Sequence, residues 1–142
     1  MITMRTLLLV LTLAGVALLA ACGGQTAGPA VEEVDLATLA DDVDVATVAA
    51  IRDNPGVFLL DVREPDEYAA GHIPGITLIP MGDVAARLAE LPRDKEIVVT
   101  CRSGNRSAQV ADFLRGQGFD NVHNMTGGLV AWEEAGYAVD GG

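Results

Sequence analysis

The sequence predicts an α/β fold of three layers, with a mainly parallel central sheet between two layers of helices. From about residue 44 onward, short apolar runs alternate with segments of helical periodicity. Strands separated by helices form parallel sheets with helices on both faces. The run at 57–60 is apolar throughout, as a strand buried on both faces requires, and the run at 97–100 is β-branched throughout, which favours a strand. The chain has no internal repeat, so we expect one domain.

The expected elements alternate in order along the chain. The strands are the short segments at residues 57–60, 77–79, 97–100 and 122–125. The helices lie at residues 44–53, 65–70, 83–91, 105–115 and 129–135.

Local signals set the helix boundaries in the first half of the domain. Asp44 is a good N-cap for the first helix, and the Asn54-Pro55-Gly56 turn ends it. Pro65 suits the first turn of the second helix, and Gly71 ends it.

Apolar spacing sets the later helices. Residues Val84, Leu88 and Leu91 stand at i, i+4 and i+7, which predicts a helix over 83–91. The helix over 105–115 is expected to bury three apolar residues and to end at Gly116; these are Val110, Phe113 and Leu114. The last helix is expected to place Trp132 in the core.

Composition excludes several function classes. Nine basic and twenty acidic residues give a net charge of −11, which argues against a nucleic-acid partner. Two cysteines and two widely separated histidines are too few for a disulfide scaffold or a metal site. We therefore expect neither a metal nor another cofactor.

The N-terminus reads as an export signal over residues 1–21. Arg5 precedes an apolar run at 7–19, which is shorter than the about 20 residues that span a membrane. The following Leu19-Ala20-Ala21-Cys22 resembles a bacterial lipobox, which implies cleavage before Cys22 and a lipid on its sulfur. We expect an exported lipoprotein anchored to the cell-envelope membrane on its periplasmic or extracytoplasmic face. An ordinary signal peptide is the alternative.

Residues 22–40 are small, polar and acidic, which predicts a flexible tether ahead of a domain at 41–142. The alternative is that 34–39 forms one helical turn packed on the domain.

Cys101 is the residue on which the functional interpretation depends. It follows the buried strand at 97–100 and precedes a helix, so it lies at the carboxyl edge of the sheet, where open α/β folds bind ligands. Unpaired amides at the helix start, with Gly104 in the turn, favour a thiolate there, and Arg102 and Arg106 add positive charge. The other interpretation is an inert, buried cysteine, because free cysteines are usually buried.

The loop Cys101-Arg102-Ser103-Gly104-Asn105-Arg106 resembles the active-site loop of the single-domain rhodanese family. Three further stretches agree with the family in order and spacing, namely 61–68 (DVREPDEY), 71–80 (GHIPGITLIP) and 127–132 (GGLVAW). The resemblance covers about residues 43–137.

The resemblance implies a rhodanese-like fold and a thiosulfate:cyanide-type sulfurtransferase, expected here as a monomer. Cys101 would take a sulfane sulfur from a small anionic donor, hold it as a persulfide, and pass it to cyanide or a thiol. Residues Arg102, Ser103, Gly104, Asn105 and Arg106 would surround the transferred sulfur.

Polar residues outside the loop receive supporting roles. Asp61 and Arg63 are expected to pair beside the loop, and His72 to act as an orienting hydrogen-bond partner rather than a base. We expect His123, at a strand edge, to face solvent.

Two other functions are considered. Related phosphatases and arsenate reductases carry an arginine six positions after the nucleophile, where this chain has Ser107, so its loop is one residue short. The second alternative is a membrane-anchored module that binds or senses sulfide through Cys101 without turnover.

Overall fold

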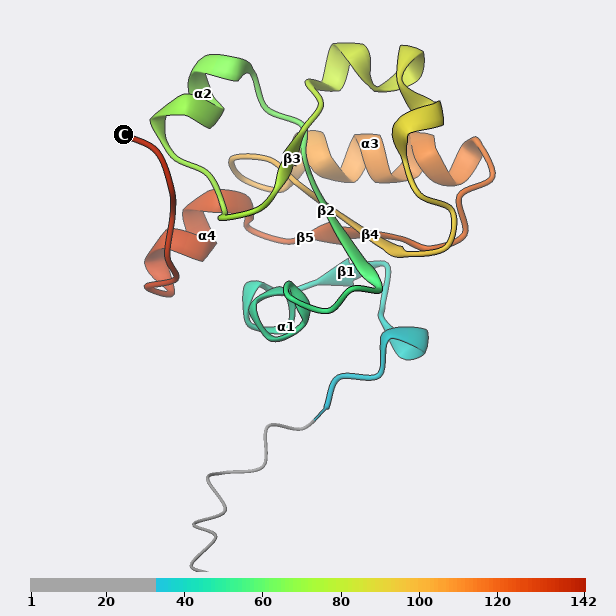
Figure 1. Ribbon diagram of the computed structural model, residues 1–142, viewed down its shortest axis with the longest axis horizontal. Coiled ribbons are helices and arrows are strands. Elements are labelled where there is room, and N and C mark those ends of the chain that lie inside the picture. The colour runs from blue at the N-terminus through green and yellow to red at the C-terminus, as the bar shows by residue number, and fades with distance from the viewer. Residues whose placement is uncertain (1–32) are drawn as a thin grey trace, which may run out of the picture. The chain divides into compact units, whose positions relative to one another are not determined.

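The computed structural model of the chain describes residues 33–142. Five strands form one parallel sheet in the order β1-β5-β4-β2-β3, with β4 at its centre (Figure 1). The strands are β1 (Asp42–Val43), β2 (Val57–Asp61), β3 (Thr77–Leu78), β4 (Glu96–Thr100) and β5 (Val122–Met125). The predicted α/β class and the parallel sheet are therefore confirmed.

Helices cover both faces of the sheet. The α-helices are α1 (Val45–Ile51), α2 (Pro65–Ala70), α3 (Asn105–Gly116) and α4 (Gly128–Glu134). Three short 3₁₀ helices accompany them, namely η1 (Leu36–Thr38), η2 (Met81–Ala86) and η3 (Leu88–Glu90). In Figure 1, α1 and α4 lie on one side of the sheet, and α3 lies on the other together with η2 and η3.

The local signals for α1 and α2 act as the sequence predicts. The Asp44 carboxylate accepts a hydrogen bond of 2.7 Å from the amide of Thr47 and so caps α1. Pro65 begins α2, and Glu64 and Glu67 form a reciprocal capping box around that first turn.

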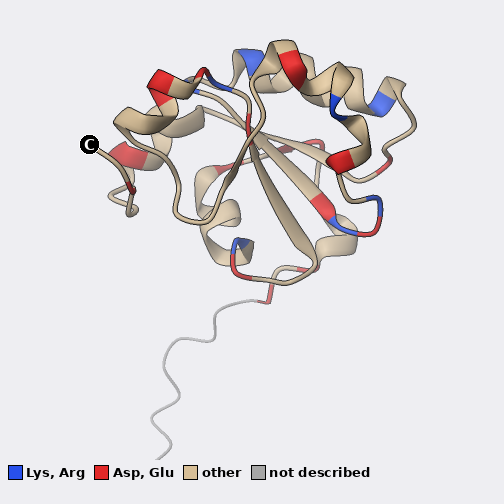
Figure 2. Cartoon of the chain, turned by 45° about the horizontal axis from the view of Figure 1, so that its top comes forward, with Lys and Arg blue, Asp and Glu red and all other residues tan. Residues whose placement is uncertain are grey.

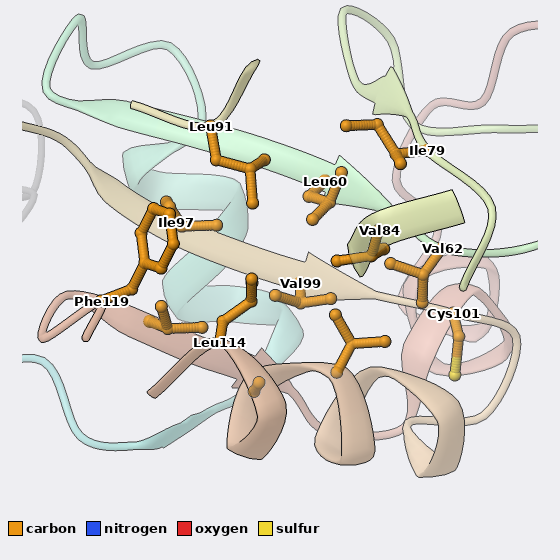
Figure 3. Packing of buried hydrophobic residues seen from close by; sticks show 13 residues of the cluster. Leu60, Val62, Ile79, Val84, Leu91, Ile97, Val99, Cys101, Leu114 and Phe119 are labelled. Carbon is orange, nitrogen blue, oxygen red and sulfur yellow. The ribbon is translucent and has the colours of Figure 1, made fainter. Parts of the chain in front are cut away.

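Two apolar clusters fill the space between the sheet and the helices. The cluster on the α3 side includes Leu60, Val99, Leu114 and Phe119, and Cys101 lies at its edge (Figure 3). The cluster on the α1 and α4 side includes Trp132, which is buried as predicted. The strand residues therefore serve the core on both faces.

The predicted α-helix over 83–91 is wrong, because the chain forms η2 and η3 there, broken at Arg87. Val84 and Leu91 are nevertheless both buried in the α3-side cluster. A 3₁₀ helix advances about 2.0 Å per residue against about 1.5 Å in an α-helix, so η2 and η3 extend farther than an α-helix with the same number of residues. The apolar spacing therefore predicts the burial of Val84 and Leu91 correctly, but it predicts an α-helix where the chain forms 3₁₀ helices.

The apolar face of α3 also differs in one position from the prediction. Val110 and Leu114 are buried as expected, whereas Phe113 is 38% exposed. Small side chains, Ser107 and Ala111, complete the buried face. They allow α3 to lie close to the sheet.

The segment ahead of α1 is part of the folded domain from residue 33 onward. Around η1, the side chains of Val34, Leu36 and Leu39 pack against the cluster on the α1 and α4 side. Residues 34–39 therefore form a turn packed on the domain, which was the alternative to a flexible tether. β1 then pairs with β5, with Asp42 opposite Asn124. This two-residue strand is not among the predicted elements.

The signal segment and Cys22 lie outside the described residues. Within 33–142, no helix has the length and apolar character needed to cross a membrane. Figure 2 shows acidic positions distributed over helices and loops of the domain, in keeping with the net charge of −11.

Candidate functional site

Cys101 lies between the end of β4 and the start of α3, as the sequence predicts. Parallel pairing places the ends of β2 and β4 side by side, with Asp61 opposite Thr100. The Cys101 side chain points from this edge toward α3 (Figure 3) and is only 1% exposed. The sulfur therefore lies beneath the loop that follows it.

Hydrogen-bond donors from the loop and from α3 surround the sulfur. The amide of Gly104 donates to Cys101 Sγ at 3.1 Å, and the Ser107 hydroxyl lies 3.4 Å from the same atom. Gly104 is the N-cap of α3 and has a φ of 95°, which L side chains rarely adopt. The left-handed turn at Gly104 thus directs an amide at the start of α3 toward the sulfur.

These contacts favour the thiolate. Burial raises the pKa of the Cys101 thiol, but hydrogen bonds from the Ser107 side chain and from the amides of Ser107, Ser103 and Gly104 lower it by more. The net effect is a pKa below the ordinary value for cysteine. A buried sulfur with dedicated donors differs from an inert core cysteine, which has an apolar surrounding.

The turn before α4 supports the loop from behind. The amides of Leu129 and Val130 donate to the carbonyls of Cys101 and Arg102 at 2.9 and 3.0 Å. A Cβ atom on Gly128 would lie 2.5 Å from the Cys101 carbonyl oxygen, so only glycine allows this approach. The family-like Gly127-Gly128 pair therefore fixes the backbone of the cysteine loop.

The two loop arginines differ in their surroundings. Arg102 is exposed and has no ion-pair partner among the described residues. Arg106 donates to both carboxylate oxygens of Glu67, at 2.7 and 2.8 Å. The Arg106 hydrogen bonds hold the pKa of Glu67 at about 2. Arg106 thus braces the loop against α2, while Arg102, Ser103 and Asn105 face solvent.

Asp61 and Arg63 form the expected pair, and both are buried. The closest contact between them is 2.7 Å. The Arg63 guanidinium also donates to the carbonyls of Glu67 and Gly71, at 3.1 and 2.8 Å. Arg63 therefore joins the end of β2 to the middle and the C-terminal end of α2, and α2 in turn carries the partner of Arg106.

Both histidines, His72 and His123, contact backbone carbonyls and side chains of the fold. His72 stacks on Tyr68, with ring centroids 3.8 Å apart, and its Nδ1 lies 2.9 Å from the Tyr68 carbonyl oxygen. The expectation that His123 faces solvent is wrong, since it is 6% exposed. Its ring nitrogens contact the Ala40 carbonyl and the Glu96 carboxylate, because pairing of β1 with β5 covers the edge that the sequence analysis left open.

Two polar residues close to the sulfur, Ser107 and Asn124, are not among the predicted site residues. The Ser107 hydroxyl contacts both Cys101 Sγ and Asn124 Oδ1, and Asn124 is buried within β5. A polar residue inside the predicted strand at 122–125 was the available signal for Asn124. Among residues 33–142, no cluster of three potential metal ligands occurs.

The sequence model of the Rhodanese-like domain family matches residues 44–135, which include every element from α1 to α4. The chain belongs to the rhodanese-like domain family. The resemblance noted in the sequence is therefore confirmed.

Named relatives of this rhodanese-like domain include sulfurtransferases. A sulfurtransferase of Allochromatium vinosum is 39% identical over 89 residues, which cover 63% of this chain and 83% of the relative. The thiosulfate sulfurtransferase GlpE of Pseudoalteromonas translucida is 36% identical over 93 residues, covering 66% and 89%.

A solved structure supports the same assignment of the fold. The crystal structure of a rhodanese-related protein from Thermoplasma volcanium superposes with a TM-score of 0.66 at 34% identity. The match covers 71% of this chain and 98% of that one.

Proposed function

We propose that this rhodanese-like domain is a sulfurtransferase that carries a sulfane sulfur as a persulfide on Cys101. One observation carries the proposal: the sulfur receives a hydrogen bond from Gly104 at 3.1 Å at the start of α3, on an otherwise strongly acidic chain. Relatives named sulfurtransferases support it.

The reaction has two steps, each a displacement at sulfur. The Cys101 thiolate attacks the sulfane sulfur of thiosulfate; a new S–S bond forms, the S–S bond of the donor breaks, and sulfite leaves with the electron pair. Cyanide or a thiolate then attacks the outer sulfur, and Cys101 leaves as the thiolate. Neither step requires a general acid or a metal.

The loop supplies electrostatic stabilisation for both steps. The persulfide places negative charge on its outer sulfur, and amides at the start of a helix stabilise an anion. Arg102 is an exposed residue of the loop, where its positive charge attracts an anionic donor. Arg106 is held by Glu67 and keeps the loop in position.

Turnover separates this function from stoichiometric sulfide binding. The purified domain, given thiosulfate and cyanide, should produce many equivalents of thiocyanate with ping-pong kinetics, because the intermediate is covalent. Product limited to one equivalent per Cys101 would instead support a binding or sensing module.

We also propose that Cys22 carries a lipid that anchors the domain to the cell-envelope membrane. The Leu19-Ala20-Ala21-Cys22 sequence supports it. Expressed in a bacterium, the full chain should enter the detergent phase of a phase-separation assay, and Cys22→Ser should remain in the aqueous phase. Equal partitioning of both into the aqueous phase would contradict the anchor.

A further inference from the structure

A line of polar side chains runs from Cys101 to an exposed carboxylate on β1. Ser107 Oγ lies 3.4 Å from Cys101 Sγ and 2.7 Å from Asn124 Oδ1. Asn124 Nδ2 in turn donates to the Asp42 carboxylate at 2.8 Å. Ser107 and Asn124 are buried, whereas Asp42, on β1, is exposed. The three elements α3, β5 and β1 thus each contribute one side chain to the line that ends at the sulfur.

Asp42 fixes the orientation of the Asn124 amide. An ionised carboxylate only accepts hydrogen bonds, so the NH₂ group of Asn124 must face it. The Asn124 carbonyl oxygen must then face Ser107, where it also acts only as an acceptor.

Ser107 has one hydroxyl proton for two acceptors. It can donate to Asn124 Oδ1 or to a thiolate at Cys101, but not to both. When Cys101 is a thiol, its S–H donates to Ser107 Oγ, and Ser107 donates to Asn124. When the thiol proton leaves to water, Ser107 must rotate toward the sulfur, and the buried Asn124 oxygen loses its donor.

We propose that Asp42 and Asn124 are positioning residues that set how readily the thiolate forms: Asp42 orients the Asn124 amide, and the Asn124 oxygen competes with the Cys101 sulfur for the Ser107 hydroxyl proton. This inference rests on the proposed function, in which that thiolate is the nucleophile.

The competition ends when the persulfide forms. The bond between Cys101 Sγ and the transferred sulfur leaves the negative charge on the outer sulfur, so Sγ no longer needs the Ser107 proton. Ser107 then returns to Asn124 and restores that hydrogen bond. The line of polar side chains from Cys101 to Asp42 thus disfavours the free thiolate relative to the persulfide. This difference in stability keeps the sulfur on Cys101 until an acceptor binds.

Other charged groups near the site define the necessary controls. On the α3 side they are Arg102 in the loop and Arg106, which is paired with Glu67 of α2. On the β1 side, Asp41 precedes Asp42 and lies 3.9 Å from Arg115 of α3. Asp41 is exposed like Asp42, and its carboxylate has no recorded contact with the Asn124 side chain.

The test measures the rate at which iodoacetamide alkylates Cys101 as a function of pH. In Asp42→Ala the Asn124 amide is free to turn, so Ser107 can donate to the sulfur without loss. The rate below its pH midpoint should rise by about two- to tenfold, the worth of one hydrogen bond, and the midpoint should move to lower pH. Asp42→Asn keeps an acceptor for Asn124 and should resemble the wild type.

Two matched variants exclude a simple charge effect. Asp41→Ala removes the same charge one residue away and should change the profile much less than Asp42→Ala. In a Ser107→Ala background, Asp42→Ala should have no further effect. Equal profiles for the two alanine variants, an Asp42→Asn profile like that of Asp42→Ala, or an Asp42→Ala effect that persists without Ser107 would each overturn the proposal.

Alkylation requires no sulfur donor, so its outcome is independent of turnover. An unchanged profile in a domain that transfers sulfur would refute the polar line alone. The expected profiles in a domain without turnover would refute the sulfurtransferase proposal alone. The variants at exposed Asp41 and Asp42 decide the matter even if Ser107→Ala does not fold.

Discussion

Arg106 donates to both carboxylate oxygens of Glu67, at 2.7 and 2.8 Å, and so joins the first turn of α3 to α2. The pair is partly buried, with 33% of the Arg106 side chain and 27% of the Glu67 side chain exposed. The Arg63 guanidinium also binds α2, because it donates hydrogen bonds to the Glu67 and Gly71 carbonyls. The ion pair between Arg106 and Glu67 thus joins the cysteine loop to α2, and the hydrogen bonds of Arg63 join α2 to the end of β2.

The pair of Arg106 and Glu67 makes the free energy of unfolding depend on pH in the acid range. The Glu67 pKa is lowered from 4.5 to about 2, so its contribution is complete above pH 4.5 and is lost as the pH falls through about 2. Glu67→Gln should cost about 1 kcal/mol of unfolding free energy at pH 7 and remove this acid dependence. Urea unfolding between pH 7 and pH 2 measures both effects.

The neighbouring Asp66→Asn is the control for Glu67→Gln, since Asp66 has no recorded contact with Arg106. A loss as large in Asp66→Asn would show that general surface charge, rather than the ion pair, is responsible.

Gly128 should be the glycine that tolerates substitution least. A Cβ there would lie 2.5 to 2.7 Å from backbone atoms of Cys101 and Arg102, at a φ of 58°. Gly128→Ala should cost about 2 kcal/mol or more and displace the loop. Gly82→Ala meets nothing within 4 Å and should change stability by less than about 0.5 kcal/mol. Equal thermal midpoints for both variants would contradict the close packing.

Much of this arrangement follows from local sequence signals. Asp44 caps α1, Pro65 begins α2, and the β-branched run before Cys101 predicts both β4 and the position of the cysteine at the sheet edge. Each of these signals acts within a few residues, which is the range over which propensity and spacing are informative.

The remaining features depend on contacts between distant elements. The line from Cys101 through Ser107 and Asn124 to Asp42 combines α3, β5 and β1, and the short β1 exists only because β5 lies beside it. Likewise, His123 is buried because Ala40 and Glu96, which are distant from it in the sequence, contact its ring nitrogens. One sequence read by local patterns does not contain these pairings.

Arg102 should act on the donor rather than on the fold. Its side chain is exposed, so Arg102→Ala should leave the unfolding free energy within about 0.5 kcal/mol of wild type. It should raise KM for thiosulfate by several-fold at low salt, by less at high salt, and Arg102→Lys should recover most of the loss. Thiocyanate formation across a salt series measures this, and identical KM values for Arg102→Ala and wild type would exclude the electrostatic role.

The most direct measurement is the intact mass of the domain after exposure to thiosulfate and then to cyanide. Thiosulfate should add one sulfur, about 32 Da, and cyanide should remove it as thiocyanate. Cys101→Ser should show no adduct and no turnover while staying within about 1 kcal/mol of wild-type stability. An adduct that persists in Cys101→Ser, or a wild-type domain that neither thiosulfate, polysulfide nor a persulfide can load, would contradict the assignment of Cys101 as the sulfur carrier.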